Sequence, residues 1–453
     1  MKSIEQIAAE LQGYDPQALS AERVNDFLAR LVAPVRETET CGIFEALGRV
    51  LAEDVVSPIS VPPHDNSAMD GFAFRGDQLR AGEPLTLHCL GTAFAGQAWS
   101  GPAGAGDCVK IMTGAIMPAG MDTVVPLEFV KVDGDAVTVP ADVVRPGDNR
   151  RLLGEDLMEG RPALRRGQTL GPAALGLIAS LGLPAVPVFR RLKVAYFSTG
   201  DEILSLGESP REGAVYDSNR YTVFGLLTRM GVQVVDMGVV RDEPQALEAA
   251  FRQAAREADA IITSGGVSMG EADHTKAMMK QLGDVAFWRI AMRPGRPMAV
   301  GRIPRTPEDE ARFAAGLPQG ESAPLGGSEA RSAASVGAVL FGLPGNPVAV
   351  MVTFLAFVRP ALQIMSGAAP SAPILLKAHS AEALRKKPGR TEYQRGVVAR
   401  EADGSLRVRT TGNQGSGVLS SMVEGNGLIV LHHGQGNVAV GDLVDVMMFD
   451  GVI

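Results

Sequence analysis

Short apolar runs alternate with amphipathic stretches from about residue 192 onward, and their lengths separate strands from helices. The runs "LKVAYFST", "DAIITS" and "AVLFGL" are short and bounded by polar or glycine residues, which is typical of buried strands. The stretches "EPQALEAAFRQAAREA" and "NPVAVMVTFLAFVRPALQIM" have the length of helices. This alternation predicts an α/β domain, in which helices cover a parallel sheet. In "GNPVAV", we expect Asn346 to be the N-cap and Pro347 the first helical residue.

The pattern differs on both sides of this region. Residues 1–35 have helical spacing, whereas short β-rich runs between glycines and prolines extend to about residue 150 and predict a small β domain. Within that domain, "DGDA" at 133–136 predicts a hairpin. Runs typical of strands return from about residue 370 and predict a small C-terminal β domain. Residues 303–338 are rich in Ala, Gly, Ser, Pro and Glu without apolar periodicity, which predicts a mobile surface insertion between two strands.

Composition narrows the class of protein. The chain has 453 residues, 45% of them hydrophobic, and a net charge of −8, so we expect several globular domains and no general basic field for nucleic acid. Cys41, Cys89 and Cys108 show no C-x-x-C pairing and are expected to be buried thiols. The first residues lack the apolar core of a secretory signal, and "VAVMVTFLAFV" is too short to cross a bilayer. We therefore expect a cytoplasmic protein without a membrane partner.

Three glycine-containing loops follow predicted strands, at residues 196–202, 262–273 and 341–347. In open α/β sheets, ligands bind outside the carboxyl ends of the strands, and glycine lets backbone N–H groups approach an anion. The middle loop supplies four candidates for holding a phosphate or another oxyanion: Ser264, Gly265, Gly266 and Ser268. The loops match neither the Walker A nor the G-x-G-x-x-G pattern. A single Gly-Gly turn is more often structural, but three such loops in one domain favour a ligand site.

Carboxylates also follow predicted strands: Asp201 and Glu202 after the first loop, Asp242 after the strand "VQVVDMGVV", and Glu271 and Asp273 after the Gly-Gly turn. Several carboxylates at one sheet edge repel each other and also repel a phosphate. A divalent cation removes this conflict, because Mg²⁺ binds one or two carboxylates together with phosphate oxygens. We therefore expect Mg²⁺ and a phosphorylated ligand. The alternative is that each acid lies in a solvated loop, and Asp273 before "HTKAMMK" would also fit a helix N-cap.

A basic segment, "FWRIAMRPGRPMAV", places Arg289, Arg293 and Arg296 beside a Pro-Gly turn. Guanidinium groups bind oxyanions through forked N–H donors, so these side chains are candidates for an oxyanion site. The alternative is a solvated basic loop. The sequence contains no pattern of a nucleophilic triad and no Cys/His spacing of a zinc site.

Several longer motifs occur in a distinctive order: "PPHDNSAMDGFA", "IMTGAIMP", "FSTGDE", "TSGGVSMGEADHTK", "AFWRIAMRPGRP", "FGLPGNPVAV", "EYQRGVV" and "TTGNQGSGVLSSM". Over nearly its whole length, the chain resembles the molybdopterin molybdenumtransferase (molybdenum insertase) family, which includes the E domain of gephyrin. The resemblance implies insertion of molybdate into adenylylated molybdopterin, with release of AMP and formation of the molybdenum cofactor. It also implies Mg²⁺ as the cation and a homodimer.

The resemblance implies a multi-domain fold of the α/β plus β class. Residues 1–50 and 145–190 would form an elongated N-terminal helical/β domain, and residues 51–144 a β-rich second domain. Residues 191–367 would form the α/β molybdopterin-binding domain around the parallel sheet, with the insertion 303–338. Residues 368–453 would form the small C-terminal β domain.

The functional positions of the family can be matched residue by residue. The catalytic candidates are Asp65, Thr113, Asp156, Glu202, Asp242 and Asp273, and the last three are also the metal candidates. Further substrate-binding candidates are Arg395 and Ser416 in the C-terminal domain, and Pro294 and Gly295 beside the three arginines. The family usually has lysines where this chain has Arg289, Arg293 and Arg296. This departure keeps the positive charge but changes the geometry of oxyanion binding.

Two other functions stay open at this stage. A molybdopterin adenylyltransferase would make the adenylylated pterin from ATP, and a non-catalytic molybdopterin-binding scaffold would bind its ligand without turnover. The additional N- and C-terminal domains argue against the first function, and the intact acids argue against the second. Partners implied by the resemblance are a molybdopterin adenylyltransferase and apo-molybdoenzymes.

Overall fold

The computed structural model describes residues 2–267, 274–306 and 337–449. Contacts divide the chain into two compact units. The first comprises Met1–Glu39, Gly48–Ala52 and Val188–Ile453, and the second comprises Thr40–Leu47 and Glu53–Pro187. Most of the insertion predicted at 303–338 lies outside the described residues, as do the site candidates Ser268 and Asp273.

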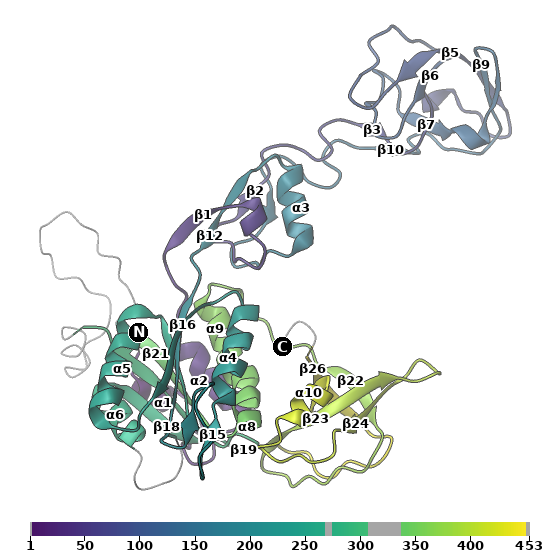
Figure 1. The fold of residues 1–453 in the computed structure, drawn as a ribbon. Helices are drawn as coiled ribbons and strands as arrows, with labels where there is room; N and C mark the ends of the chain where they lie inside the picture. Colours follow the sequence, from purple (N-terminus) through teal and green to yellow (C-terminus); the bar gives the residue numbers. More distant parts are fainter. Residues whose placement is uncertain (1, 268–273, 307–336, 450–453) are drawn as a thin grey trace, which may run out of the picture. The chain divides into compact units, whose positions relative to one another are not determined.

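A six-stranded sheet forms the centre of the first unit (Figure 1). Its strands, in spatial order, are β16 (Gln233–Val240), β13 (Lys193–Thr199), β17 (Ala260–Ser264), β21 (Gly337–Leu343), β20 (Pro297–Pro304) and β18 (Asp284–Arg289). The strands from β16 to β21 are parallel, whereas β20 is antiparallel to both of its neighbours. The predicted parallel-sheet domain is therefore confirmed, with an antiparallel edge. Because the parallel strands end at one edge, the loops that follow them lie together.

Helices cover both faces of this sheet, since alternate side chains of each strand point to opposite faces. On β13, Tyr196 belongs to one buried apolar cluster and Phe197 to the other. The helices on the first face are α4 (Ser218–Arg229), α8 (Pro347–Thr353) and α9 (Arg359–Met365), and those on the second are α5 (Pro244–Glu257) and α6 (His274–Leu282) (Figure 1). The result is a three-layer α/β domain with two cores.

The segment Pro347–Met365 is one continuous apolar helix, in which α8 and α9 are joined by a π-helical turn, η4 (Phe354–Val358). By length and composition it could cross a membrane, but 78% of its apolar window is buried inside the protein. It is therefore a core helix. The prediction that "VAVMVTFLAFV" is too short to cross a bilayer was wrong about length, because the helix continues on both sides of that run. Asn346 is the N-cap and Pro347 lies in the first helical turn, as predicted, although the Asn346 side chain makes no capping hydrogen bond.

The N-terminal helices α1 (Ile4–Glu10) and α2 (Ala21–Leu31) pack into the core on the first face of the sheet. The Phe27 ring contacts Trp288 edge-to-face, with ring centroids 4.9 Å apart. On β20, the buried Arg302 donates hydrogen bonds to the backbone carbonyls of Lys2 and Leu31. Burial lowers the pKa of Arg302 to about 10, which still leaves it charged at neutral pH.

These contacts differ from the domain boundaries expected from the sequence, which grouped residues 1–50 with 145–190. The contacts instead join Met1–Glu39 to the α/β unit. The physical reason is the apolar face of both helices, which is buried against α9 and β18.

A second six-stranded sheet in the first unit is formed largely by C-terminal residues. Its order is β19 (Met292–Arg293), β23 (Thr391–Arg400), β24 (Leu406–Thr410), β22 (Leu376–Ser380), β26 (Leu443–Met448) and β25 (Gly427–Leu431), with β23 also paired to β25. A short helix, α10 (Ser420–Glu424), follows the loop after β24. The pairing of β19 with β23 joins a loop of the α/β domain to this sheet.

The second unit contains its own six-stranded sheet, in the order β7 (Thr123–Pro126), β4 (Gly71–Phe74), β6 (Asp107–Ile111), β5 (Leu85–Ala93), β9 (Ala136–Val139) and β8 (Lys131–Asp133). The antiparallel pair β8–β9 confirms the hairpin predicted at "DGDA". Gly134 in this turn has a φ of 58°, which a glycine adopts without strain. On β4, Phe72 and Phe74 lie in one apolar cluster and Ala73 lies in another.

Smaller elements complete the chain. The second unit has two short antiparallel pairs and one helix, namely β2 (Val55–Val56) with β11 (Pro162–Leu164), β3 (Asn66–Ser67) with β10 (Arg150–Arg151), and α3 (Pro172–Ser180). The strands β1 (Thr38–Gly42) and β12 (Ala185–Phe189) pair with each other, and the pair β14 (Ile203–Leu204) and β15 (Val215–Tyr216) belongs to the first unit.

The contact between Phe27 and Trp288 predicts that the N-terminal helices stabilise the α/β unit. We expect Phe27→Ala to lower the free energy of unfolding by about 3–5 kcal/mol, because a fully buried ring is replaced by a cavity. Denaturant titration in a Trp99→Phe background, where Trp288 is the single tryptophan, measures the effect by fluorescence. Phe44→Ala is the control, since the Phe44 side chain is fully exposed. Equal stabilities of the two variants would contradict this role of α2.

Candidate active site

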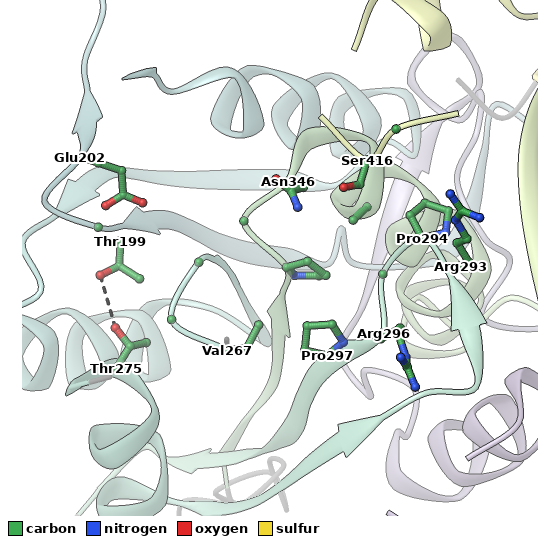
Figure 2. Close-up of a pocket in the computed structure, with 18 of the residues that line it drawn as sticks. Thr199, Glu202, Val267, Thr275, Arg293, Pro294, Arg296, Pro297, Asn346 and Ser416 are labelled. Atoms are coloured by element: carbon green, nitrogen blue, oxygen red, sulfur yellow. Dashed lines mark hydrogen bonds between the residues drawn. The ribbon is translucent and has the colours of Figure 1, made fainter. Parts of the chain in front are cut away.

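A cavity of about 900 Å³ opens at the carboxyl edge of the parallel strands in the first unit (Figure 2). Five groups of residues form its wall. They are Thr199 at the end of β13 with Gly200 and Glu202; Asp242 after β16; Gly265, Gly266 and Val267 after β17 with Thr275 of α6; Arg293–Pro297; and Pro344–Asn346 with Ala349. Gln414, Gly415 and Ser416 from the C-terminal part add a sixth. The cavity therefore lies where the topology of an α/β sheet predicts a ligand site.

Carboxylates occupy one end of the cavity. Glu202 and Asp242 both line it, as the sequence predicted for two of the three metal candidates. The Glu202 carboxylate folds back over Gly200, where a Cβ atom would lie 2.5 Å from the nearest carboxylate oxygen. Gly200 has a φ of 142°, so this position favours glycine for its backbone as well as for the space. The third candidate, Asp273, lies outside the described residues.

Two buried threonines contact the acidic end, and neither was among the predicted site residues. The Thr275 hydroxyl donates to Asp242 Oδ1 at 3.1 Å, and the Thr199 hydroxyl lies 3.3 Å from that of Thr275 (Figure 2). Thr199 ends β13 and Thr275 is the second residue of α6. The sequence signal that could have found them is a hydroxyl residue at the end of a strand or the start of a helix, close to a predicted acid.

The Gly-Gly turn passes directly over these threonines. A Cβ atom on Gly266 would lie less than 3.0 Å from Thr275, and one on Gly265 would lie 2.5 Å from the carbonyl oxygen of Thr199. Both glycines have positive φ values, 91° for Gly265 and 64° for Gly266. The Gly265 N–H donates to the carbonyl of Leu343 at 3.2 Å, so this N–H is used inside the protein. The turn therefore needs glycine for close packing as well as for its backbone shape.

The structure does not place the Ser264 side chain on the cavity wall. Ser264 ends β17 and is buried, and its hydroxyl lies 2.6 Å from the Tyr196 hydroxyl and 3.2 Å from that of Ser198. The alternation of side chains along a strand turns Ser264 toward the face that Tyr196 occupies. The Ser264 hydroxyl therefore lies in the buried interior of the sheet and does not face the predicted phosphate site. Ser268, predicted in the same loop, lies outside the described residues.

Arginines occupy the opposite end of the cavity. Arg293 and Arg296 line it together with Pro294 and Gly295, and both arginines are exposed (Figure 2). Arg289, which was predicted with them, ends β18 and does not belong to the cavity wall. β18 pairs with β20 as an antiparallel edge, so Arg289 lies beside Pro297, before the turn that carries the other two arginines.

Neighbouring elements hold this basic loop in place. Arg293 is the register partner of Glu392 in the β19–β23 pair. The Ile290 N–H donates to the carbonyl of Arg296 at 2.7 Å, which closes the loop on itself. Gly295 has a φ of 89°, and a Cβ atom there would lie less than 3.0 Å from the Thr353 hydroxyl. The loop is thus anchored to the C-terminal sheet on one side and to α8 on the other.

Arg395 acts on the cavity through the loop that contains Ser416. Its guanidinium is fully buried and donates to the Ser421 hydroxyl and to the carbonyl of Gly415, both at 2.9 Å. Its backbone N–H donates to the Gln414 side chain at 2.8 Å. Burial, followed by the positive charge of Arg293, lowers the pKa of Arg395 to about 10. Ser416 lines the cavity as predicted, whereas Arg395 lies behind the wall and shapes the loop.

The remaining predicted residues belong to the second unit. Asp65 Oδ1 accepts a hydrogen bond from the Leu153 N–H at 2.8 Å, and Asp65 Oδ2 lies 3.6 Å from Arg150 Nη1. The Met117 N–H donates to the carbonyl of Asp65, which brings the predicted loop of Thr113 beside it. Asp156 is exposed, and its backbone N–H donates to Val61.

Asp70 fixes Thr113 and was not among the predicted site residues. Its Oδ1 accepts from both the backbone N–H and the hydroxyl of Thr113, each at 2.7 Å. Both hydrogen bonds stabilise the charged carboxylate, the backbone one most strongly. They therefore hold the pKa of Asp70 below its ordinary value. The Thr113 hydroxyl is therefore already engaged as a donor.

The donor set at the acidic end fits a shared Mg²⁺ ion. Among the described residues, no group of three or more His, Cys, Asp or Glu side chains is arranged to hold a metal. Two carboxylates, Glu202 and Asp242, line the same cavity. Mg²⁺ commonly takes one or two carboxylates and completes its octahedron with substrate phosphates and water. The two acids therefore fit an ion shared with a phosphorylated ligand, and they do not form a closed protein cage.

The close packing of the Gly-Gly turn gives a direct prediction. We expect Gly266→Ala to lower stability by about 1–3 kcal/mol beyond the cost of the positive φ, because the added methyl group overlaps Thr275. Gly213→Ala is the matched control, since Gly213 has a φ of 76° and a methyl group there would meet no atom within 4 Å. Thermal unfolding of both variants separates overlap from backbone strain. Equal melting temperatures would contradict the close contact.

Comparisons with known proteins agree with the motif resemblance. Residues 19–182 match the MoeA N-terminal region (domain I and II), residues 195–364 a probable molybdopterin binding domain, and residues 377–449 the MoeA C-terminal region (domain IV). The molybdopterin molybdenumtransferase of Haemophilus influenzae is 38% identical over 418 residues, which cover 92% of this chain and 95% of the relative. A molybdopterin molybdenumtransferase of a Nostoc species is 32% identical and covers 91% and 89%, respectively.

The fold agrees as well. The crystal structure of a molybdopterin biosynthesis moeA protein from Pyrococcus horikoshii superimposes with a TM-score of 0.73 at 26% identity, covering 95% of this chain and 100% of that chain. Another crystal structure of a molybdopterin biosynthesis moeA protein from the same organism gives a TM-score of 0.68 at 26% identity. On this sequence identity, coverage and structural similarity, the chain belongs to the molybdopterin molybdenumtransferase family.

Proposed function

We propose that this protein transfers molybdate into adenylylated molybdopterin, releasing AMP and forming the molybdenum cofactor. The observation that supports this most directly is the distribution of charge in one cavity. Glu202 lies at one end of it, where Thr275 also holds Asp242, and Arg293 and Arg296 lie at the other (Figure 2). The reaction needs both kinds of group, because it joins a pyrophosphate-bearing pterin to a metal oxyanion.

The basic end is suited to molybdate, which is a dianion. Arg293 and Arg296 each offer several N–H donors, and Ser416 adds a hydroxyl from the facing loop. Hydrogen bonds from a charged donor to an oxyanion are stronger than neutral ones. The guanidiniums would attract molybdate and hold it away from the carboxylates, which repel it. The arginines that replace the family's usual lysines keep this charge and add forked donors.

The acidic end is suited to the pyrophosphate of the substrate with its cation. Glu202 and Asp242 would hold Mg²⁺ from the protein side, and the ion would offset the charge that develops as the P–O bond breaks. The Gly-Gly turn, which has no side chains in the way, would approach the phosphate closely. Asp273 and Ser268 stay predictions for the same part of the site.

The second unit supplies further candidates for the reaction. The proposed catalytic residues in this unit are Asp65, Thr113 and Asp156. Hydrogen bonds fix the side chains of Asp65 and Thr113, as expected for groups that act on a ligand. We also propose a cytoplasmic homodimer that exchanges ligands with a molybdopterin adenylyltransferase and with apo-molybdoenzymes. These last proposals rest on the family alone.

The coupling of AMP release to molybdate tests the proposed reaction. Purified protein given adenylylated molybdopterin and Mg²⁺ should release AMP only when molybdate is added, and chromatography of the nucleotides measures this. Equal release without molybdate would contradict the coupling. Consumption of ATP with molybdopterin alone would instead indicate an adenylyltransferase, and binding without turnover would indicate a scaffold.

Arg296 and Arg289 should respond differently to substitution. We expect Arg296→Ala to raise the molybdate concentration for half-maximal AMP release by at least about tenfold, because a charged hydrogen bond to an oxyanion is lost. Arg289→Ala should change it by less than about twofold, since Arg289 lies outside the cavity wall. The two variants remove the same charge from the same segment, so a difference between them reports position. Equal effects would contradict the placement of molybdate at this end.

A further inference from the structure

The hydrogen bonds at the acidic end form a chain with a defined direction. The Asp242 carboxylate can only accept, so the Thr275 hydroxyl must direct its single proton toward Asp242 Oδ1 at 3.1 Å. The Thr275 oxygen then has only acceptor capacity left. The Thr199 hydroxyl, 3.3 Å away, must therefore be the donor in the contact between the two threonines. The direction runs from Thr199 through Thr275 to Asp242.

Burial makes this chain a fixed support. Thr275 is fully buried and Thr199 is 4% exposed, whereas Asp242 is only partly buried and lines the cavity. β-branched side chains have restricted χ1 rotamers, which limits how far the hydroxyls can turn away. The Gly-Gly turn closes over them, since Gly266 leaves no room for a methyl group against Thr275. One contact thus sets the positions of the turn and of the carboxylate together.

We propose that Thr275 is a positioning residue that holds the Asp242 carboxylate in the orientation that binds the divalent cation. This inference rests on the proposed function of the site, and it deepens it by naming what sets the affinity for the cation. Thr275 engages Oδ1 from the protein side and leaves Oδ2 to the ligand. Without it, Asp242 would sample other rotamers and lose conformational entropy on each binding event.

The chain offers matched substitutions for this test. Thr275→Val keeps the shape of the side chain and removes the hydroxyl, whereas Thr275→Ser keeps the hydroxyl and removes a methyl group. Thr263→Val is a third variant. Thr263 is also fully buried, on β17, and its hydroxyl has no hydrogen-bond partner in the described part of the chain. It therefore controls for the loss of a buried threonine hydroxyl that supports no carboxylate.

The first readout is binding of Mn²⁺, used as a paramagnetic probe for the cation, to the full-length protein without substrate. We expect Thr275→Val to raise the Mn²⁺ dissociation constant about three- to tenfold, the range that corresponds to the net contribution of one ordinary intramolecular hydrogen bond. Thr275→Ser and Thr263→Val should stay within about twofold of the unsubstituted protein. Thermal unfolding of each variant confirms that it is folded. An unchanged Mn²⁺ affinity in Thr275→Val would overturn the proposal.

A double-substitution cycle identifies the residue through which Thr275 acts. In an Asp242→Ala background, Thr275→Val should have no further effect on Mn²⁺ binding, because the acceptor of its hydrogen bond is already removed. Additive effects would show that Thr275 acts elsewhere and would overturn the proposal. The same variants can be compared in AMP release at increasing Mg²⁺. If the unsubstituted protein released no AMP, the proposed function would fail, while the Mn²⁺ results would still decide the role of Thr275.

Discussion

The site depends on keeping opposite charges apart inside one cavity. Glu202 and Asp242 would form ion pairs with Arg293 and Arg296 if the chain allowed contact, and a paired charge is largely lost to a ligand. Within the described ranges, no ion pair includes any of these residues, and each end of the cavity keeps its own sign of potential. A ligand that carries a cation at one end and an oxyanion at the other relieves the repulsion within each end. The selectivity of the site is a consequence of this separation.

Rigid attachments enforce the separation. The acids follow parallel strands, whose carboxyl ends meet at one edge because of the topology. The arginines lie on a turn that is held by the β19–β23 pair and packs against Thr353 through Gly295. Each group is thus tied to the end of a strand or to a strand pair. The glycines at positions 200, 266 and 295 allow this, since each lets a turn approach a side chain more closely than any other residue would.

Strand direction made part of the site predictable from the sequence, whereas the features that depend on packing were not predictable. Glu202 and Asp242 were found because residues after parallel strands gather at one edge, a rule that needs no coordinates. Arg293 and Arg296 were found because guanidinium groups beside a Pro-Gly turn suit an oxyanion. Arg289 belongs to the same basic segment, but its exclusion depends on how β18 pairs at the antiparallel edge. Ser264 was assigned to a loop, whereas β17 continues through it and the strand alternation buries its hydroxyl. The N-terminal helices join the α/β core through tertiary contacts that no local pattern specifies.

The C-terminal sheet bears on the choice between insertion of molybdenum and nucleotidyl transfer. Gln414 and Ser416 complete the basic end of the cavity, and the buried Arg395 gives their loop its shape through hydrogen bonds to Gly415 and Gln414. β23 also anchors the turn that carries Arg293. An α/β domain alone would keep the acidic end and the Gly-Gly turn, which suffice for a nucleotide and its cation. The C-terminal residues join the cavity wall only at the basic end, which favours a function with a second anionic ligand over nucleotidyl transfer alone.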